Sequence, residues 1–490
     1  MMSHYLAIDL GAESGRVIRG SLRSGKLSMT EVHRFSNGAI KSKNTLRWDF
    51  PRLIKEIEIG LQKAAKLGPV KSIGCDSWGV DYVLINQAGE VIDLPYCYRD
   101  ERTDATFAEV QKKLSPQKIF SATGIGSLSI NTLYQLYADL KTRPKVLKNT
   151  DKFLLIGDAV SWKLTGKIRA EETLISGSQL WDTRKNQWAW PLIEKLNIPK
   201  HFFPETIQPG KVIAKLSPAL EKKTKLKNVQ VVAVCAHDTA SAVAAVPAPK
   251  GNQWAYLSSG TWSLLGVELN KPLINEAVRK ANFTNEIGHN RTTRFLKCLV
   301  GLWILQECRR EWVKTDKKLD YTSITQQAEK SAELRSLIRP DDSRFSKMGS
   351  MAKKVQDYCR ETKQPIPQSV GEITRCILDS LALLYRAELD GLEKLTRRKI
   401  KQIHIVGGGC RNDVLNQATA NATGRVIVTG PVEATAMGNI LVQAMATKEL
   451  KNIEELRQVV RRSNPFKTFK PKSAAPWAKA YSLFKKLPKS

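Results

Sequence analysis

Asp238 is the residue of this sequence best placed to move a proton. It follows the apolar run 231–234 and precedes a run of small residues, 239–246. An aspartate between a strand and a helix most often caps the helix N-terminus. Aimed at a hydroxyl group, the same carboxylate would act as a general base, taking the proton while the oxygen attacks the γ-phosphate of a nucleotide. The segment alone favours capping, and the two roles are compatible.

Residues 9–16 and 258–261 have the composition of phosphate-binding turns. Asp9 ends an apolar run and two glycines follow it, so that turn amides, Ser14 and Arg16 can hold phosphate oxygens. Asp9 itself can act on Mg²⁺ through water. The Ser-Ser-Gly-Thr sequence of residues 258–261 is a second hydroxyl-rich turn. The alternative for both is a structural hairpin turn; two such turns facing each other would clamp a phosphate.

A third glycine-rich turn, residues 407–409, follows the apolar run 404–406. Asn412 and Asp413 can cap the next helix, whose first amides would face the loop. Glycines there would let a base or a phosphate approach the backbone closely. The sequence has no P-loop, and the cluster is not a dinucleotide fingerprint because position 412 is Asn. A nucleotide site and a plain strand-to-helix turn are equally compatible with this segment.

Residues 76–81 combine two carboxylates with the indole of Trp78, a composition that favours a sugar pocket. A buried turn with an N-capping aspartate is the alternative. The six histidines show no ligand spacing, and no metal cage is indicated.

These turns follow strand-like runs that alternate with helix-like segments, the pattern of an α/β protein. In open α/β sheets ligands lie beyond the carboxyl ends of the strands, which makes the turns natural site candidates. The segments near residues 6 and 255 each predict a β-hairpin, with second strands at 16–19 and 263–267. Helices are expected at 302–313, 372–395 and 413–422, and a surface-docked tail after residue 463. The Pro- and Gly-rich stretch 247–252 predicts a linker or hinge between domains 1–247 and 248–490.

The composition is that of a globular protein, with 42% hydrophobic and 26% charged residues. The 78 Lys and Arg against 47 Asp and Glu give a net charge of +31, which would attract polyanions or phosphorylated metabolites. The basic residues are spread over short stretches, so a solvated surface is favoured over nucleic-acid binding. The eight cysteines form no C-x-x-C pair, and the apolar stretch 229–249 is interrupted by His237 and Asp238. We therefore expect a cytoplasmic protein without a membrane span.

The motifs taken together resemble the FGGY carbohydrate kinases, in order over nearly the whole chain. Segments similar to the family are Asp-Leu-Gly at 9–11, Asp-Ser-Trp-Gly-Val-Asp at 76–81, Asn-Thr-Leu-Tyr-Gln-Leu at 131–136 and His-Asp-Thr-Ala-Ser-Ala at 237–242. Segments similar to its rhamnulokinase branch are Ser-Ser-Gly-Thr-Trp-Ser at 258–263, Gly-Leu-Trp at 301–303, Gln-Pro-Ile-Pro at 364–367 and Gly-Pro-Val-Glu-Ala-Thr at 430–435.

The resemblance implies two actin-like ATPase domains of the ribonuclease H type, with sugar and ATP meeting in a cleft between them. It also implies transfer of the ATP γ-phosphoryl group to the 1-hydroxyl of L-rhamnulose, with Mg²⁺. Asp238 is then the proton acceptor, and the implied sugar-binding residues are Gly79, His237, Asp238, Thr239 and, by position, Cys298. The implied ATP-binding residues are Ala12, Glu13, Ser14, Gly15, Arg16, Thr261, Gln306, Gly408 and Gly409, with Asp9 toward the metal.

Two residues depart from the family pattern. Glu13 stands where the phosphate loop usually carries Ser or Thr, and its charge opposes ATP unless it turns outward or meets a cation. Cys298 replaces an Asn that contacts sugar, and a thiol is a weak hydrogen-bond partner. The alternatives are therefore a kinase for another ketose, such as L-fuculose or xylulose, and a weakly active sugar-binding regulatory relative. Its partners would be small molecules, and the oligomeric state, monomer or weak dimer, is open.

Overall fold

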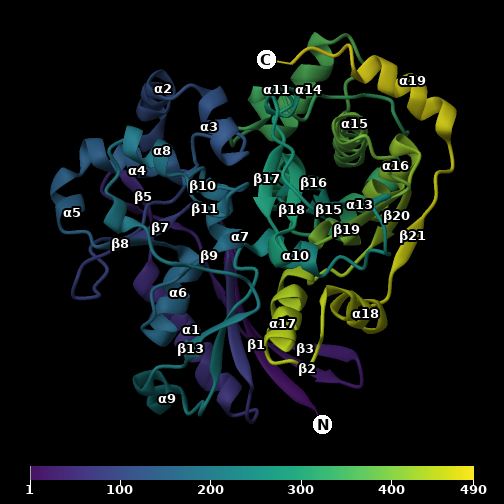
Figure 1. Cartoon of the computed structure of the whole chain (residues 1–490). Coiled ribbons are helices and arrows are strands. Elements are labelled where there is room, and N and C mark those ends of the chain that lie inside the picture. Colours follow the sequence, from purple (N-terminus) through teal and green to yellow (C-terminus); the bar gives the residue numbers. More distant parts are fainter. Residues whose placement is uncertain (1, 490) are drawn as a thin grey trace. The chain divides into compact units, whose positions relative to one another are not determined.

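The computed structural model describes residues 2–489 and divides into two compact units (Figure 1). The first comprises Met1–Pro247, Glu268–Phe295 and Ala434–Ser463, and the second comprises Ala248–Val267, Leu296–Glu433 and Asn464–Ser490. The expected boundary after residue 247 is the first of several points at which the chain passes from one unit to the other. Two later segments return to the first unit.

The first unit is built on a six-stranded sheet in the order β13-β14-β6-β1-β2-β3. Strands β14, β6 and β1 are parallel, whereas β1, β2 and β3 form antiparallel hairpins, of which the first was predicted. Their bounds are Lys211–Lys215 for β13, Gln230–Ala233 for β14, Ser72–Ser77 for β6, Ser3–Leu10 for β1, Ser14–Arg23 for β2 and Lys26–Ser36 for β3. All of β6 and nearly all of β1 are buried, as expected for parallel strands covered on both faces.

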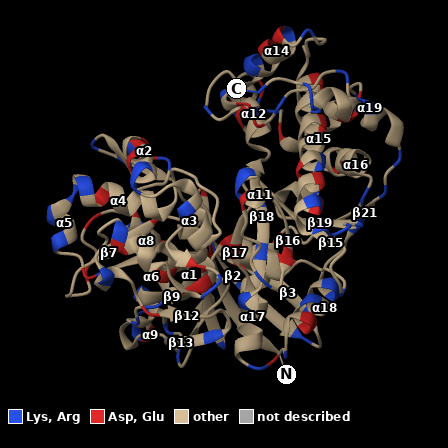
Figure 2. Cartoon of the chain, turned by 45° about the horizontal axis from the view of Figure 1, so that its top comes forward, with Lys and Arg blue, Asp and Glu red and all other residues tan. Residues whose placement is uncertain are grey.

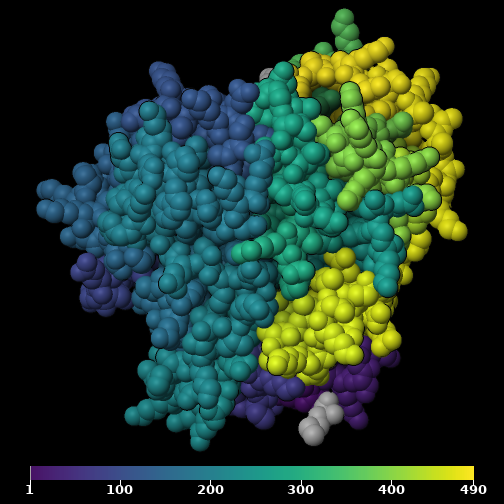
Figure 3. All heavy atoms as spheres, viewed as in Figure 1, coloured from purple at the N-terminus to yellow at the C-terminus, as the bar shows by residue number. Residues whose placement is uncertain are grey.

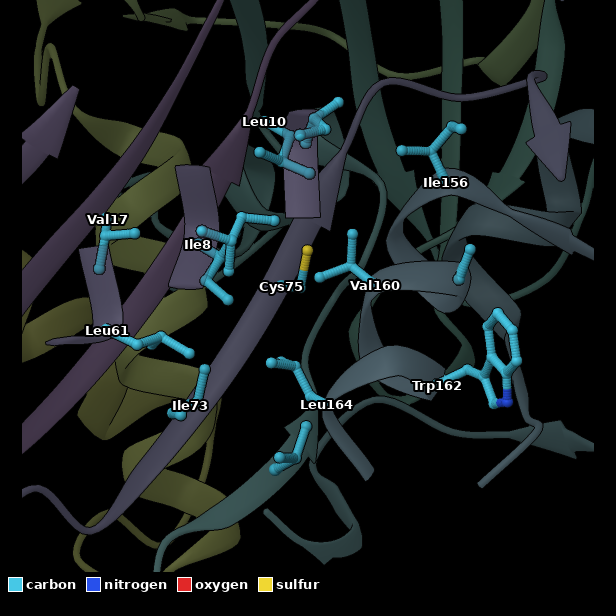
Figure 4. Close-up of a cluster of buried hydrophobic side chains, with 14 of the residues drawn as sticks. Ile8, Leu10, Val17, Leu61, Ile73, Cys75, Ile156, Val160, Trp162 and Leu164 are labelled. Carbon is cyan, nitrogen blue, oxygen red and sulfur yellow. The ribbon is translucent and has the colours of Figure 1, made fainter. Parts of the chain in front are cut away.

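Helices cover both faces of this sheet. Helices α1 (Phe50–Ala65) and α6 (Ile156–Thr165) pack on the face that carries Ile73 and Cys75 (Figure 4). Because side chains alternate along a strand, Gly74 faces the other way, where it meets Asn439 and Gln443 of α17 (Ala434–Ala446). Figure 3 shows α17 and α18 (Ile453–Ser463), in yellow, against the purple N-terminal strands. A segment from the far end of the sequence thus completes the first unit.

A second apolar cluster of this unit surrounds the antiparallel pair β7 (Tyr82–Ile85) and β8 (Lys152–Leu155). The remaining helices of the unit are α2 (Asp104–Lys113), α3 (Pro116–Thr123), α4 (Thr132–Thr142), α5 (Pro144–Lys148), α7 (Glu172–Ile175), α8 (Trp190–Lys195), α9 (Pro218–Thr224), α10 (Asp238–Ala244) and α11 (Glu276–Lys280). Its short strands are β4 (Ala39–Ser42), β5 (Thr45–Trp48), β9 (Ala170–Glu171), β10 (Trp181–Asp182), β11 (Gln187–Trp188), β12 (Thr206–Ile207) and β17 (Thr284–Ile287).

The second unit repeats the central pattern of the first. Strand β15 (Trp254–Ser259) pairs antiparallel with β16 (Trp262–Leu269) and parallel with β19 (Gln402–Val406), as β1 pairs with β2 and β6. The predicted second hairpin is therefore present. Beyond β19 come β20 (Val426–Thr429) and β21 (Lys467–Phe469). Strand β18 (Thr293–Val300), like β16, begins in one unit and ends in the other.

The helices of the second unit confirm the periodicity predictions. They are α12 (Trp303–Thr315), α13 (Tyr321–Glu329), α14 (Met351–Glu361), α15 (Val370–Thr396), α16 (Asp413–Thr423) and α19 (Ala474–Phe484). Ser369 and Glu372 form a capping box at the start of α15, and Trp477 and Phe484 bury the inner face of the terminal α19. Lys and Arg are spread over the helices and loops of both units (Figure 2). Within residues 2–489, the helices lack the combination of length and apolar character that a membrane span needs.

Candidate active site

The carboxyl ends of β1, β6 and β14 gather the predicted catalytic and sugar-binding residues of the first unit. Asp9 and Asp76 are partners in the parallel β1–β6 register, and Ser77 forms a β-bridge with His237 just after β14. The Ser77 amide also donates to the Ala236 carbonyl at 2.8 Å. The topology thus brings Asp9, the 76–81 turn and the 237–239 segment to one edge of the sheet, as expected for an open α/β fold.

The turn after β1 is a tight hairpin that presents backbone amides. The Gly11 amide donates to the Ser14 carbonyl at 2.9 Å, and the Asn37 side chain donates to the Gly11 carbonyl at 2.8 Å. A Cβ on Gly15 would lie 2.2 Å from the Phe35 ring, so only glycine fits there. Arg16 pairs with the Asp9 carboxylate. Glu13 is exposed on this turn, which agrees with the outward orientation that ATP binding would require.

Asp76 is an acid buried beneath this edge. Its Oδ2 accepts a hydrogen bond from Asn439 Nδ2 of α17 at 2.6 Å, while Oδ1 has no hydrogen-bond partner among the described residues. Burial, together with the nearby Asp9 charge, raises the pKa of Asp76 well above its usual value. This environment therefore favours the protonated form of Asp76.

The following turn is held by two tryptophans and a glutamine. Asp81 Oδ2 accepts from the indoles of Trp48 and Trp78 at 2.7 and 3.1 Å, and Oδ1 accepts from Gln135 at 3.0 Å. Val80 has a φ of 69°, a left-handed conformation that strains a β-branched residue. Its carbonyl accepts from Thr132 Oγ1 at 2.8 Å. The 131–136 motif thus fixes the loop that presents Gly79.

His237 occupies the N-cap position of α10, and Asp238 is the first residue of that helix. The aspartate therefore does not cap α10 as the segment alone suggested; its Oδ1 instead accepts from the adjacent Thr239 amide at 2.5 Å. The Asp238 side chain is 31% exposed and lies with its Oδ1 3.6 Å from His237 Nε2. A Cβ on Gly79 would lie 3.4 Å from the same Nε2, so the glycine leaves the imidazole edge accessible.

Burial raises the pKa of Asp238, although the neighbouring His237 and the Thr239 amide act against the shift. A carboxylate with a raised pKa is a stronger base than an ordinary aspartate. The arrangement is suited to accepting a proton from an alcohol bound at this edge.

A second layer of polar residues supports the 236–239 segment. Glu171 Oε2 accepts from the Ala236 amide at 3.0 Å, and the same carboxylate caps α7 through the Thr173 and Leu174 amides. Arg294 is fully buried and donates to Thr239 Oγ1 at 2.9 Å and to Glu286 Oε2 at 2.8 Å. The sequence analysis missed this layer because its members lie on distant segments with no motif of their own.

In the second unit, the two predicted glycine turns lie next to each other. Strands β15 and β19 pair Ser258 with Val406, and a Cβ on Gly409 would lie 2.1 Å from Ser259 Oγ. Gly409 is buried whereas Gly408 is exposed. As predicted, Asn412 caps α16, its side chain accepting from the Leu415 amide at 2.9 Å. This turn leaves backbone accessible at Gly408.

The Thr261 carbonyl joins the hairpin turn to the start of α12, because it accepts from the amides of Gly301 and Trp303 at 3.2 Å each. Gln306 is partly buried in the first turns of the same helix. Cys298 is exposed on β18 in this unit, whereas the other predicted sugar-binding residues lie in the first unit.

The residues present suit a magnesium nucleotide better than a protein-bound metal. Among residues 2–489, His, Cys, Asp and Glu side chains form no group of three or more that could hold a metal ion. Mg²⁺ usually keeps several waters and takes one or two carboxylates plus phosphate oxygens. Asp9, a buried carboxylate that pairs with Arg16 beside a turn of backbone amides, is the residue at this edge that could hold one of those waters.

Comparison with known proteins shows the family of this chain. The models of the N-terminal and C-terminal domains of the FGGY family of carbohydrate kinases match residues 4–245 and 255–447. A rhamnulokinase of Bacteroides thetaiotaomicron is 41% identical over 99% of this chain and 99% of its own, and one of Bacillus subtilis is 42% identical over 96% and 95%.

Solved structures show the same fold at low identity. A gluconate kinase from Lactobacillus acidophilus has a TM-score of 0.82 at 16% identity, covering 99% of this chain and 97% of its own. A xylulose kinase from Rhodospirillum rubrum has a TM-score of 0.80 at 14% identity, covering 99% and 98%. The predicted two-domain α/β fold is thus confirmed, and the chain belongs to the FGGY family of carbohydrate kinases.

Proposed function

We propose that this carbohydrate kinase transfers the γ-phosphoryl group of ATP to the 1-hydroxyl of L-rhamnulose, giving L-rhamnulose 1-phosphate and ADP. The observation that carries the proposal is full-length identity above 40% to two rhamnulokinases. It is supported by the position of Asp238, a partly exposed carboxylate of raised pKa at the carboxyl edge of the first sheet. A cytoplasmic location, with sugar and ATP as the partners, is part of the proposal.

The first unit would bind and deprotonate the sugar. The carboxylate of Asp238 lies at the same edge of the sheet as Gly79, His237 and Thr239. A sugar hydroxyl bound there can contact both the His237 imidazole and the Asp238 base. Asp238 takes the hydroxyl proton as the oxygen attacks phosphorus, and its neutral form is then stabilised by the burial that raised its pKa. We propose that Cys298 contacts the sugar more weakly than the Asn of the family pattern would, because a thiol is a weak hydrogen-bond partner.

The nucleotide would be held by backbone more than by charge. We assign the turn 12–16 of the first unit to the phosphates, and Thr261, Gln306, Gly408 and Gly409 of the second unit to the rest of ATP. Bound Mg²⁺ would neutralise phosphate charge, with Asp9 holding one of its waters. That the two sets of residues meet around one ATP in a cleft stays a prediction.

The proposal is tested by measuring phosphorylation of a ketose panel, L-rhamnulose, L-fuculose and xylulose, with MgATP. We expect the highest kcat/KM on L-rhamnulose. Asp238→Asn should lower kcat by about 10²–10⁴-fold, the usual contribution of a positioned base, with an unchanged circular dichroism spectrum. If another ketose gives a higher kcat/KM, that ketose is the substrate and the L-rhamnulose proposal is wrong. If the wild-type protein binds L-rhamnulose without turnover, the chain is a non-catalytic relative of the kinases.

A further inference from the structure

The imidazole of His237 lies between two carboxylates of the first unit. Its Nδ1 is 3.2 Å from Glu286 Oε2 on β17, and its Nε2 is 3.6 Å from Asp238 Oδ1 on α10. The ring edge that faces Asp238 is also the one that Gly79 leaves accessible. One nitrogen therefore faces the interior of the unit and the other faces the base.

Arg294 holds the interior side of this arrangement. It is fully buried and donates to Glu286 Oε2 at 2.8 Å, to Thr239 Oγ1 at 2.9 Å and to the Ile287 carbonyl at 3.1 Å. A guanidinium carries several donors in a rigid fork, so it can fix these groups together. Thr239 Oγ1 accepts the bond from Arg294 and also lies 3.4 Å from His237 Nδ1. When Nδ1 carries a proton, the oxygen can only accept there, which leaves the hydroxyl proton of Thr239 for a ligand oxygen.

Glu286 decides which ring nitrogen of His237 carries a proton. Burial alone would favour its neutral form, but the Arg294 charge and the His237 hydrogen bond outweigh burial and lower the pKa of Glu286 to about 2. An ionised carboxylate can only accept, so the Nδ1 that faces it must donate. Two other groups also face Nδ1: Arg294 Nη2 at 3.2 Å and Thr239 Oγ1 at 3.4 Å. A guanidinium can only donate, whereas a hydroxyl oxygen can accept, so Glu286 is the charged acceptor that faces this nitrogen.

We propose that Glu286 and Arg294 are positioning residues of the sugar site, which keep a proton on Nδ1 of His237 and direct Nε2 and the Thr239 hydroxyl toward the sugar beside Asp238. This inference rests on the proposed function, because it takes the ligand at this edge to be the ketose. Neither residue touches the reacting atoms. They determine how well the imidazole and hydroxyl are oriented when the sugar arrives, which governs sugar affinity.

The proton position can be read directly by long-range ¹H–¹⁵N NMR of protein labelled at its six histidines. The signals of His237 are assigned by their loss in His237→Gln. We expect a protonated Nδ1 in the wild type, and in Glu286→Gln a shift of the proton toward Nε2, because Arg294 then becomes the strongest group facing Nδ1. An unprotonated Nδ1 in the wild type would overturn the inference, whatever sugar the enzyme uses.

Steady-state kinetics test the consequence for the sugar. Glu286→Gln removes the charge that faces His237 Nδ1, so we expect it to raise KM for the ketose about tenfold or more, with KM for ATP within about twofold. Glu286→Asp serves as a second variant, since it keeps the charge beside buried Arg294 and so preserves folding, yet withdraws the carboxylate from Nδ1. It should raise the same KM.

Glu268→Gln is the matched control. Glu268 pairs at 2.5 Å with Arg457, an arginine that is 9% exposed in the same unit, so the control removes a comparable ion pair away from His237. It should leave both KM values unchanged. Equal KM values for the ketose in all three variants and the wild type would overturn the inference, as would an equal rise in the control. Absence of ketose turnover in the wild type would instead refute the proposed function and leave the NMR result to decide on His237.

Discussion

The carboxylate of Asp81 shows how one buried charge can hold a loop of the sugar site. It accepts from the indoles of Trp48 and Trp78, the Tyr98 amide and the Gln135 side chain, so both oxygens face donors. In Asp81→Asn, one of these donors would face an amide NH₂ in either orientation. We expect a loss of about 1–3 kcal/mol of stability, the usual cost of one buried unsatisfied donor.

Differential scanning calorimetry and tryptophan fluorescence check this result. The melting temperature should fall, and the emission of the two indoles should shift, because both lose the same acceptor. Thr45→Ser, a change at a partly buried hydroxyl that donates to the Ser42 carbonyl at 2.9 Å, is a mild control on a neighbouring strand. An Asp81→Asn protein as stable as the wild type would show that the loop does not depend on this acceptor.

Residues with a local signature could be predicted from the sequence, and residues without one could not. Asp9, Gly79 and Asp238 lie at or shortly after the ends of strand-like runs, so the end of a strand places them. Glu286 and Arg294 reach the site only because β17 and β18 pass beside α10, which no spacing in the sequence reveals. The left-handed conformation of Val80 could not be predicted either, because β-branched residues rarely adopt a positive φ.

At the scale of elements, Glu171 couples the start of α7 to the strand end before His237. Burial outweighs its four accepted hydrogen bonds and raises the pKa of Glu171 to about 7, above the unfolded value of 4.5. The folded state therefore binds more protons than the unfolded state between these values, and the stability contributed by this group falls as pH rises. The shift corresponds to about 3 kcal/mol between pH 4.5 and 7.

Glu171→Gln removes this titration while keeping most of the acceptor geometry. The difference in unfolding free energy, wild type minus variant, should therefore decrease as pH rises from about 4.5 to 7. Calorimetric melting of both proteins across that range measures it. The substitution itself adds an offset that does not depend on pH, so only the slope is decisive, and a slope of zero would contradict the raised pKa.

The packing of α17 against α10 gives a second prediction at this scale. A Cβ on Gly438 would lie 1.9 Å from the Ser241 carbonyl, closer than any real contact, so Gly438→Ala must push the two helices apart. Helix propensity alone would favour alanine by about 1 kcal/mol, but we expect a net loss of about 2 kcal/mol from overpacking. Asp238 begins α10, so kcat on the ketose should fall as well.

Gly38→Ala is the control for Gly438→Ala, because a Cβ at Gly38 meets nothing within 4 Å. Its melting temperature and kcat should equal those of the wild type. The Gly438 prediction fails if both alanine variants melt at the wild-type temperature. Periodicity predicted helices α12, α15 and α16 of the second unit but not α17, and the packing of α17 on α10 depends on contacts distant in sequence.

At the scale of the whole molecule, the net charge of +31 and the spread of basic residues over both units explain why composition said little about function. The two predicted hairpins, each extended by a parallel strand, recur in the two units as β1-β2-β6 and β15-β16-β19. This repeat was visible in the sequence because each hairpin is local. The return of 434–463 to the first unit was not visible, since the sequence divides most simply at the Pro-rich stretch.

Because residues 434–463 belong to the first unit, we predict that residues 1–247 do not fold alone. In the full chain, Gln443 of α17 donates to the Leu6 carbonyl at 2.9 Å and accepts from Ser72 at 2.7 Å, and Asn439 donates to Asp76 at 2.6 Å, all in buried surroundings. Without α17, one face of the sheet would be exposed and these polar groups would lose their partners.

A fragment of residues 1–247 should show no cooperative melting transition and rapid proteolysis. Covalent extension of that fragment by residues 268–295 and 434–463 through flexible linkers should restore a transition, because it supplies every segment of the first unit. Cooperative melting of the short fragment would mean that the sheet is stable without α17.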